Sequence, residues 1–223
     1  MNDNKLKTIA ILGGTGELGP GLALRWAQAG YRVLIGSRQA EKAQGVADEL
    51  KAKLDGGQIR GMENAAAAQE ADICVLTVEA SAHEAALESV KAALGGKILV
   101  DATARINFPE LKPPSPPSAG RIAQDLLGES GRVVTAFQNI PARALQDLSQ
   151  TELGDVLVCA DELEAAEAVM PLVEAAGMRA YYAGDLDKAI VVEGLTTLMV
   201  ALNKHYRSRH GTIKVAGIPR PND

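Results

Sequence analysis

The sequence contains few aromatic residues, few cysteines and no basic run, and each shortage argues against a class of function. Phe, Trp and Tyr make up only 3% of the 223 residues, which argues against the stacking surfaces that bind single-stranded nucleic acid. The formal net charge is −5, which is unfavourable for a partner with a phosphate backbone. We therefore expect no nucleic-acid partner.

Long apolar runs and metal-binding patterns are also absent from the sequence. No apolar run approaches the roughly 18 residues of a membrane-spanning helix, and the opening MNDNKLK does not resemble a secretory signal. The two cysteines, Cys74 and Cys159, stand alone inside apolar segments, so we interpret them as buried, reduced thiols and predict no metal site. These features predict a cytoplasmic protein without a membrane partner.

Hydrophobic residues make up 47% of the chain, and short apolar runs alternate with helical segments. The predicted strands lie at 7–13, 31–36, 57–62, 72–78, 96–103, 131–140, 154–160 and 178–184. The predicted helices lie at 18–30, 40–54, 64–71, 81–94, 119–128, 161–177 and 185–207. The strand runs are continuously apolar, as in strands that are covered on both faces. This alternation predicts an α/β fold with a parallel, doubly wound sheet.

Residues 101–118 interrupt the alternation and contain five of the ten prolines. We interpret this segment as a long surface loop over the sheet edge or the mouth of an active site. A linker between two domains is the alternative.

The sequence Gly14-Thr15-Gly16-Glu17-Leu18-Gly19 matches the pattern G-x-G-x-x-G between a predicted strand and a predicted helix. Gly14 would permit a tight turn, Gly16 would let the backbone approach a pyrophosphate, and Gly19 would let the helix pack on the strand. The N-terminus of the helix offers N–H groups and the positive end of its dipole to phosphates. The pattern predicts a dinucleotide site, and a tight turn without a ligand is the alternative.

The end of the second predicted strand indicates which dinucleotide is bound. An NAD site usually has Asp or Glu there, whereas this chain has Ser37 and Arg38, followed by Lys42. A serine hydroxyl and two cations can bind a 2′-phosphate that a carboxylate would repel. We therefore predict NADP, although two solvated charges at a helix start would have the same pattern. The expected division is a Rossmann-type NADP-binding domain over 1–160 and a smaller, helical C-terminal extension over 161–223 that packs on it.

Residues 11–43, ILGGTGELGPGLALRWAQAGYRVLIGSRQAEKA, resemble the start of the NADPH-dependent reductases of coenzyme F420, an 8-hydroxy-5-deazaflavin. The segments 61–78 and 133–145 lie where that family has matching segments, and the chain length and the helix-rich C-terminus also agree. The resemblance implies an oxidoreductase that transfers a hydride between NADP(H) and a deazaflavin ring. Such a reaction needs two rings held face to face and little acid–base chemistry.

The ends of the predicted strands supply the expected site, because ligands of an open parallel sheet lie beyond the carboxyl ends of its strands. Thr77, Val78 and Ala102 are expected beside the nicotinamide. The residues expected to take part in the reaction are Gln138, Asn139, Ile140 and Glu79. The first three would meet the acceptor ring, with Pro141 beside them.

Glu79 and Gln138 depart from the family, which often has proline at the first position and in some members histidine at the second. The Glu79 carboxylate could bind a cationic acceptor, protonate an imine, or cap a helix that begins at Ser81. The acceptor could therefore also be a flavin, a ferric chelate or an imine. A non-catalytic protein that senses NADPH is a further alternative. We interpret His83, at a helix start beyond the fourth predicted strand, as a surface or packing residue, with a place facing the site as the alternative.

The last predicted helix is apolar around much of its circumference. Its apolar residues are Ile190, Val191, Leu195, Leu198, Met199, Val200 and Leu202. A helix of this kind needs cover on more than one side, and one sheet face supplies only part of it. We therefore expect a homodimer, in which His205 and His210 are contact or solvated residues.

Overall fold

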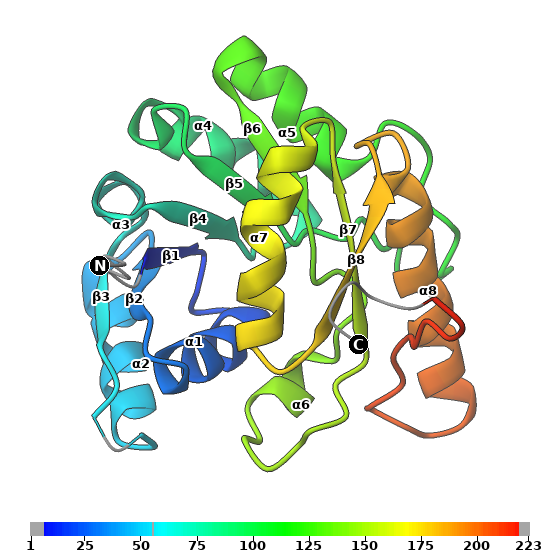
Figure 1. Ribbon diagram of the computed structural model, residues 1–223, viewed down its shortest axis with the longest axis horizontal. Helices are drawn as coiled ribbons and strands as arrows, with labels where there is room; N and C mark the ends of the chain where they lie inside the picture. The colour runs from blue at the N-terminus through cyan, green and yellow to red at the C-terminus, as the bar shows by residue number, and fades with distance from the viewer. Residues whose placement is uncertain (1–6, 55, 219–223) are drawn as a thin grey trace.

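The computed structural model describes residues 7–54 and 56–218, and its centre is one sheet with the strand order β3-β2-β1-β4-β5-β6-β7-β8 (Figure 1). The strands are β1 Thr8–Leu12, β2 Arg32–Ser37, β3 Ile59–Glu63, β4 Ile73–Leu76, β5 Ile98–Asp101, β6 Arg132–Thr135, β7 Asp155–Ala160 and β8 Arg179–Gly184. The first six strands pair in parallel, as the alternating sequence predicts. The doubly wound α/β fold is therefore confirmed.

Helices cover both faces of the sheet. The α-helices are α1 Leu18–Gln28, α2 Ala40–Lys51, α3 Asn64–Glu70, α4 His83–Leu94, α5 Ala119–Leu127, α6 Ala142–Leu145, α7 Leu163–Ala175 and α8 Ala189–His205. Two short 3-10 helices, η1 Ala80–Ala82 and η2 Gly128–Ser130, complete the set. Alternate residues of each strand point to opposite faces, so Ile9 and Ile11 join the core under α1, α2 and α7, whereas Ala10 and Leu12 join the core under α3, α4 and α5.

The prediction of an entirely parallel sheet is wrong at β7. This strand runs antiparallel to β6, with Val134 opposite Ala160 and Thr135 opposite Cys159, and β8 then pairs in parallel with β7. Two parallel neighbours need a long crossover, usually through a helix. The connection from β6 to β7 contains only the short α6, and no such crossover is formed. The predicted boundary at residue 160 falls directly after β7, which pairs with β8 of the proposed extension.

Buried polar contacts join distant segments of this core. The indole of Trp26 in α1 donates to the carbonyl of Leu172 in α7 at 2.7 Å. The buried guanidinium of Arg25 donates to the carbonyls of Leu145 at 3.0 Å and Asp147 at 2.8 Å, and burial lowers the pKa of Arg25. These bonds fix α1 against the segment that follows β6.

Both cysteines are buried and reduced, as predicted. Burial raises the pKa of Cys74 to about 12 and that of Cys159 to about 11. Neither thiol is therefore ionised at neutral pH. Among residues 7–54 and 56–218, no helix has the length and apolar character needed to cross a bilayer.

Candidate active site

A glycine turn joins β1 to α1. Gly13, one residue before the predicted pattern, has the left-handed backbone with φ 70°, and the Gly14 N–H donates to the carbonyls of Ile11 at 3.2 Å and Gly36 at 2.9 Å. A Cβ on Gly19 would lie 2.5 Å from the Gly14 carbonyl oxygen. Helix α1 can therefore approach the turn this closely only with glycine at position 19.

The outer side of the turn is open. Gly16 and Glu17 are exposed, Thr15 and Leu18 are half-buried, and a Cβ on Gly16 would meet nothing closer than the Gly13 oxygen at 3.6 Å. Within the described part of the chain, the N–H groups of Thr15 and Glu17 have no acceptor. Free N–H groups at the start of a helix, beside open space, fit the phosphates of a dinucleotide.

Asn64, which the sequence analysis did not single out, holds this turn from α3. Its buried side chain accepts a hydrogen bond from the Gly13 N–H at 3.0 Å. A Cβ on Gly36 would lie 2.6 Å from the Asn64 Oδ1 atom, so Gly36 leaves room for this contact. The signal for Asn64 in the sequence was a polar residue at the first position of a predicted helix.

Ser37, Arg38 and Lys42 lie together at the end of β2 and the start of α2. Ser37 is buried, and its hydroxyl accepts a long hydrogen bond of 3.4 Å from the Gln39 N–H. Arg38 and Lys42 are exposed, and neither forms an ion pair with any residue that the structure describes. Two unpaired cations at the end of the strand next to the glycine turn fit a phosphate group.

Thr77 and Val78 lie against the glycine turn, and Ala102 pairs with the end of β4; their place beside the nicotinamide stays a prediction. Thr77 N–H and Oγ1 donate to the Leu12 carbonyl at 2.9 and 3.2 Å, and the Ala102 N–H donates to the Leu76 carbonyl at 3.0 Å. A Cβ on Gly13 would lie 2.5 Å from Cγ1 of Val78. The ends of β4 and β5 are therefore paired and form one wall, which touches the turn through Thr77 and Val78.

Glu79 follows this wall and is exposed. The suggestion that it caps a helix beginning at Ser81 is wrong, because its side chain makes no capping bond and α4 begins at His83 after the 3-10 helix η1. The carboxylate is free to reach a ligand or solvent.

Gln138 and Asn139 follow β6, and both are buried. Gln138 Nε2 donates to the Asp101 carbonyl at 3.1 Å, and no partner within the described residues satisfies its buried Oε1. Asn139 is expected to face the acceptor, but Nδ2 instead donates to the Val192 carbonyl at 2.9 Å and to Thr196 Oγ1 at 2.8 Å. The Asn139 amide therefore holds α8, and Gln138 Oε1 and Thr135 Oγ1 are buried polar atoms without a partner among the described residues at this strand end.

Ile140 is also expected to face the acceptor, and the structure places most of its side chain in the core. It is 7% exposed and belongs to the hydrophobic core under α1 and α7. The chain turns sharply before it, since Phe137 has φ 74°. This turn directs Ile140 inward, and Pro141 after it is half-buried.

His83 and Asp101 form a buried pair that the sequence analysis missed. His83 Nε2 lies 2.6 Å from Asp101 Oδ2, and the two residues are 3% and 0% exposed. Asp101 Oδ1 accepts from the Thr103 N–H at 2.9 Å, which orients the chain after β5. Burial disfavours the charged form of His83, but the hydrogen bond and charge of Asp101 outweigh it and raise the pKa of His83.

In the described ranges, no three His, Cys, Asp or Glu side chains gather in a way that could hold a metal ion. The candidate site thus consists of a glycine turn with free N–H groups, two unpaired cations and a wall of strand ends, and the buried His83–Asp101 pair lies at the end of β5.

Comparison with known proteins gives consistent matches. A family described as NADP oxidoreductase coenzyme F420-dependent matches residues 8–105. The chain is 40% identical to the F420-dependent NADP reductase of Methanothermobacter marburgensis, with 95% of this chain and 99% of that protein covered. It is 38% identical to the F420-dependent NADP reductase of Methanothermobacter thermautotrophicus, with 95% of each chain covered. A solved structure from Arthrobacter sp. FB24, described as a candidate F420-dependent NADP reductase, has a TM-score of 0.79 and 25% identity, and the match covers 95% of this chain and 100% of that chain.

Proposed function

The chain belongs to the family of coenzyme F420-dependent NADP oxidoreductases, and we propose that its glycine turn and strand ends hold NADP(H) and F420 face to face. It is an NADP-dependent oxidoreductase that transfers a hydride between these two coenzymes. The observation that carries the assignment is the 40% identity to an F420-dependent NADP reductase over 95% of the chain. We expect the protein to act in the cytoplasm, because its two buried cysteines are unpaired.

The proposed NADP(H) site consists of the glycine turn, Ser37, Arg38 and Lys42. The open N–H groups of Thr15 and Glu17 would bind the pyrophosphate. The free cations of Arg38 and Lys42 would bind the 2′-phosphate. When bound, the dinucleotide supplies or accepts the hydride, and the task of the protein is to hold it in place and exclude water.

The proposed acceptor site lies between the wall formed by Thr77, Val78 and Ala102 and the segment after β6. Gln138 contributes an unsatisfied Oε1 and is itself oriented by the Asp101 carbonyl. The loop over 102–118 begins at the same edge of the sheet. In this arrangement Asn139 and Ile140 hold the segment after β6 in place and need not contact the acceptor ring. Asn139 does so through its hydrogen bond to α8, and Ile140 through its packing in the core.

The test is a panel of acceptors. Purified protein is mixed with NADPH, the NADPH absorbance is followed, and F420, FMN, ferric citrate and a cyclic imine are added in separate reactions. We expect a rapid loss of NADPH absorbance when F420 is added, and none with the other three acceptors. The proposal would be contradicted if another acceptor were reduced rapidly and F420 were not reduced. If no acceptor were reduced, the result would favour a non-catalytic protein that binds NADPH.

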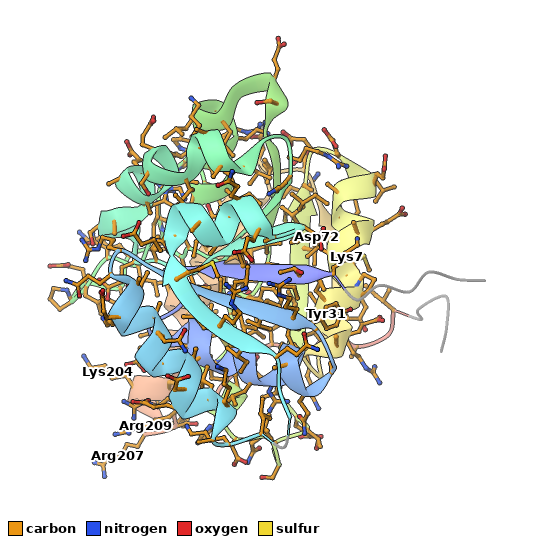
Figure 2. All side chains as sticks on the ribbon, turned by 90° about the vertical axis from the view of Figure 1, so that its left-hand side faces the viewer. Lys7, Tyr31, Asp72, Lys204, Arg207 and Arg209 are labelled. Carbon is orange, nitrogen blue, oxygen red and sulfur yellow. The ribbon has the colours of Figure 1, made fainter. Side chains whose placement is uncertain are left out.

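We also propose that residues 161–223 form a C-terminal extension and that α8 provides the contact of a homodimer. Three apolar residues of α8 are exposed at helical spacing: Val191, Leu198 and Leu202 are 65%, 52% and 40% exposed. Lys204, Arg207 and Arg209 project outward near the end of this helix (Figure 2). Their like charges favour an antiparallel packing of two α8 helices, in which these ends lie apart.

A further inference from the structure

Glu193 lies in the middle of the apolar helix α8 and is 1% exposed. One oxygen, Oε1, accepts from the Ala119 N–H at 2.6 Å. The other, Oε2, accepts from the Arg105 N–H at 3.3 Å and from the Arg105 Nε at 3.1 Å. Residues 105 and 119 stand at the two ends of the proline-rich loop, so a single carboxylate holds both ends.

The loop between these ends is folded on itself. The Arg105 Nη2 donates to the Ser115 carbonyl at 2.6 Å across the loop, and Asn107 and Lys112 form an antiparallel bridge. Ser118 Oγ donates to the Leu186 carbonyl at 2.9 Å. The loop is therefore a compact unit with defined anchors. The alternative of a linker between domains is wrong, because the chain leads from β5 through this loop and α5 to β6, the neighbouring strand of the same sheet.

A loop of this composition needs anchors from outside. The five prolines of 101–118 lack an N–H group, so the loop has few donors with which to build its own backbone network. A buried carboxylate supplies the acceptors that the ends of the loop require. Burial raises the pKa of Glu193. The hydrogen bond from the Ala119 N–H and the charge and hydrogen bonds of Arg105 oppose this shift, so the contacts with the loop stabilise the buried carboxylate.

Helix α8 also holds the segment after β6, which lies opposite the wall of strand ends in the proposed acceptor site. Val192 and Thr196, on either side of Glu193 in α8, accept the two hydrogen bonds of the Asn139 amide. Thr196 Oγ1 further donates to the Gln138 carbonyl at 3.1 Å. Helix α8 therefore joins the segment after β6 to the loop after β5, which are the two segments proposed to flank the acceptor.

We propose that Glu193 is a positioning residue of the acceptor site: through Arg105 and Ala119 it fixes the 102–118 loop over the ends of β5 and β6, and so sets the space for the acceptor ring. This inference rests on the proposed function, because it assigns the loop to the acceptor side. If the inference holds, loss of the Glu193 carboxylate raises the KM for the acceptor. The affinity for NADPH, whose proposed site consists of the glycine turn and the end of β2, stays unchanged.

The experiment compares Glu193→Gln with the unmutated protein and with Glu162→Gln. Glu162 pairs with Arg132 at 3.0 Å on the surface and is 54% exposed, so this control removes a carboxylate–arginine pair outside the loop. For Glu193→Gln we expect the acceptor KM to rise about tenfold, as for one lost charged hydrogen bond, with the NADPH Kd within about twofold. The control should change neither constant.

Hydrogen exchange of the protein without coenzymes gives a readout that does not depend on activity. Amides of residues 105–119 should exchange faster in Glu193→Gln than in the unmutated protein, while those of the glycine turn should not. If Glu193→Gln fails to fold, Arg105→Gln serves in its place, since the Arg105 side chain is 26% exposed and the N–H groups of residues 105 and 119 can still bond Glu193 in that variant. The expected changes are the same.

Two results would overturn the proposal: unchanged exchange in the loop, or faster exchange with an unchanged acceptor KM, which would make Glu193 purely structural. The unmutated protein is assayed first. If it does not reduce F420, the proposed function fails, and the Glu193 comparison is made with the acceptor that the panel identifies. The two failures are therefore distinct.

Discussion

Arg38 is the single residue most directly tied to the choice of coenzyme. It is exposed and unpaired within the described chain, so its charge is available to a 2′-phosphate. We expect NADPH to bind at least about tenfold more tightly than NADH, and Arg38→Asp to erase or reverse this preference at a cost of about 1.5–3 kcal/mol. Fluorescence titration with both coenzymes measures the ratio. Lys51→Ala, at the far end of α2, is the control, and equal affinities in the unmutated protein would contradict the assignment.

Glu79 offers a test of the acceptor. Its φ of −69° suits proline, and its N–H has no acceptor within the described residues, so Glu79→Pro should fold with unchanged stability. If a deazaflavin accepts the hydride, the carboxylate takes no part and turnover with F420 should stay within about threefold of the unmutated rate. A loss of a hundredfold or more, shared by Glu79→Gln, would point instead to a cationic acceptor.

The buried pair of His83 and Asp101 should make stability depend on pH. The pKa of His83 is raised in the folded chain, so this pair stabilises the fold fully below the ordinary histidine pKa of about 6.5. The stabilisation is lost as the pH rises through the raised value. We expect the difference in free energy of unfolding between the unmutated protein and His83→Gln to shrink over that range. Denaturant unfolding at several pH values measures it, and a difference that is constant with pH would show that the pair is not ionic.

The sequence was informative about residues whose role depends on their neighbours in the chain. Gly14, Gly16, Ser37 and Arg38 are recognisable because a turn and a strand end are local features. The contact of His83 with Asp101 joins residues 18 apart, and that of Glu193 with Arg105 joins residues 88 apart. Such contacts follow only from the packing of the sheet and helices. An acidic residue within a largely apolar helix was the one signal for Glu193.

At the scale of elements, the junction of α1 with the glycine turn sets the entry of the dinucleotide. A Cβ on Gly19 would collide with the backbone of Gly14, so Gly19→Ala must displace α1 and should cost about 1–3 kcal/mol of stability and weaken NADPH binding. Gly45, inside α2, has nothing within 4 Å of its hypothetical Cβ. Gly45→Ala should therefore stabilise the protein by about 0.5–1 kcal/mol. Thermal unfolding of both variants checks the pair, and equal effects would contradict the argument.

Most element boundaries could be predicted from hydrophobic runs and turn residues, but the end of β6, predicted at 140 and found at Thr135, and the direction of β7 could not. The predicted strand 154–160 agrees with β7 at Asp155–Ala160, because a continuously apolar run is a local property. Its antiparallel direction depends on the route of the chain from β6. The last helix, predicted over 185–207, begins later, at Ala189, because residues 185–188 form a turn in which the Lys188 N–H donates to the Asp185 carbonyl.

At the scale of the whole molecule, the exposed stripe on α8 predicts self-association. Leu198 is the central residue of that stripe and is 52% exposed. We expect the unmutated protein to be a dimer at micromolar concentration and Leu198→Glu to be a monomer, as measured by light scattering, because a charge buried in an apolar contact is strongly unfavourable. Leu163, 50% exposed at the start of α7, is the matched control, and Leu163→Glu should remain dimeric. A monomeric unmutated protein would refute the proposed contact.

The two buried thiols make local opening of this sheet measurable by alkylation. Cys74 lies in β4, within the parallel part, and Cys159 lies in the reversed strand β7. Both are fully enclosed, so iodoacetamide can reach either one only while the structure around it is open. Equal rates of alkylation at the two sites would mean that the sheet opens as one cooperative unit. A faster rate at Cys159 would mean that β7, β8 and α8 open first, and the ratio of the rates would then measure how independent the C-terminal part of the chain is.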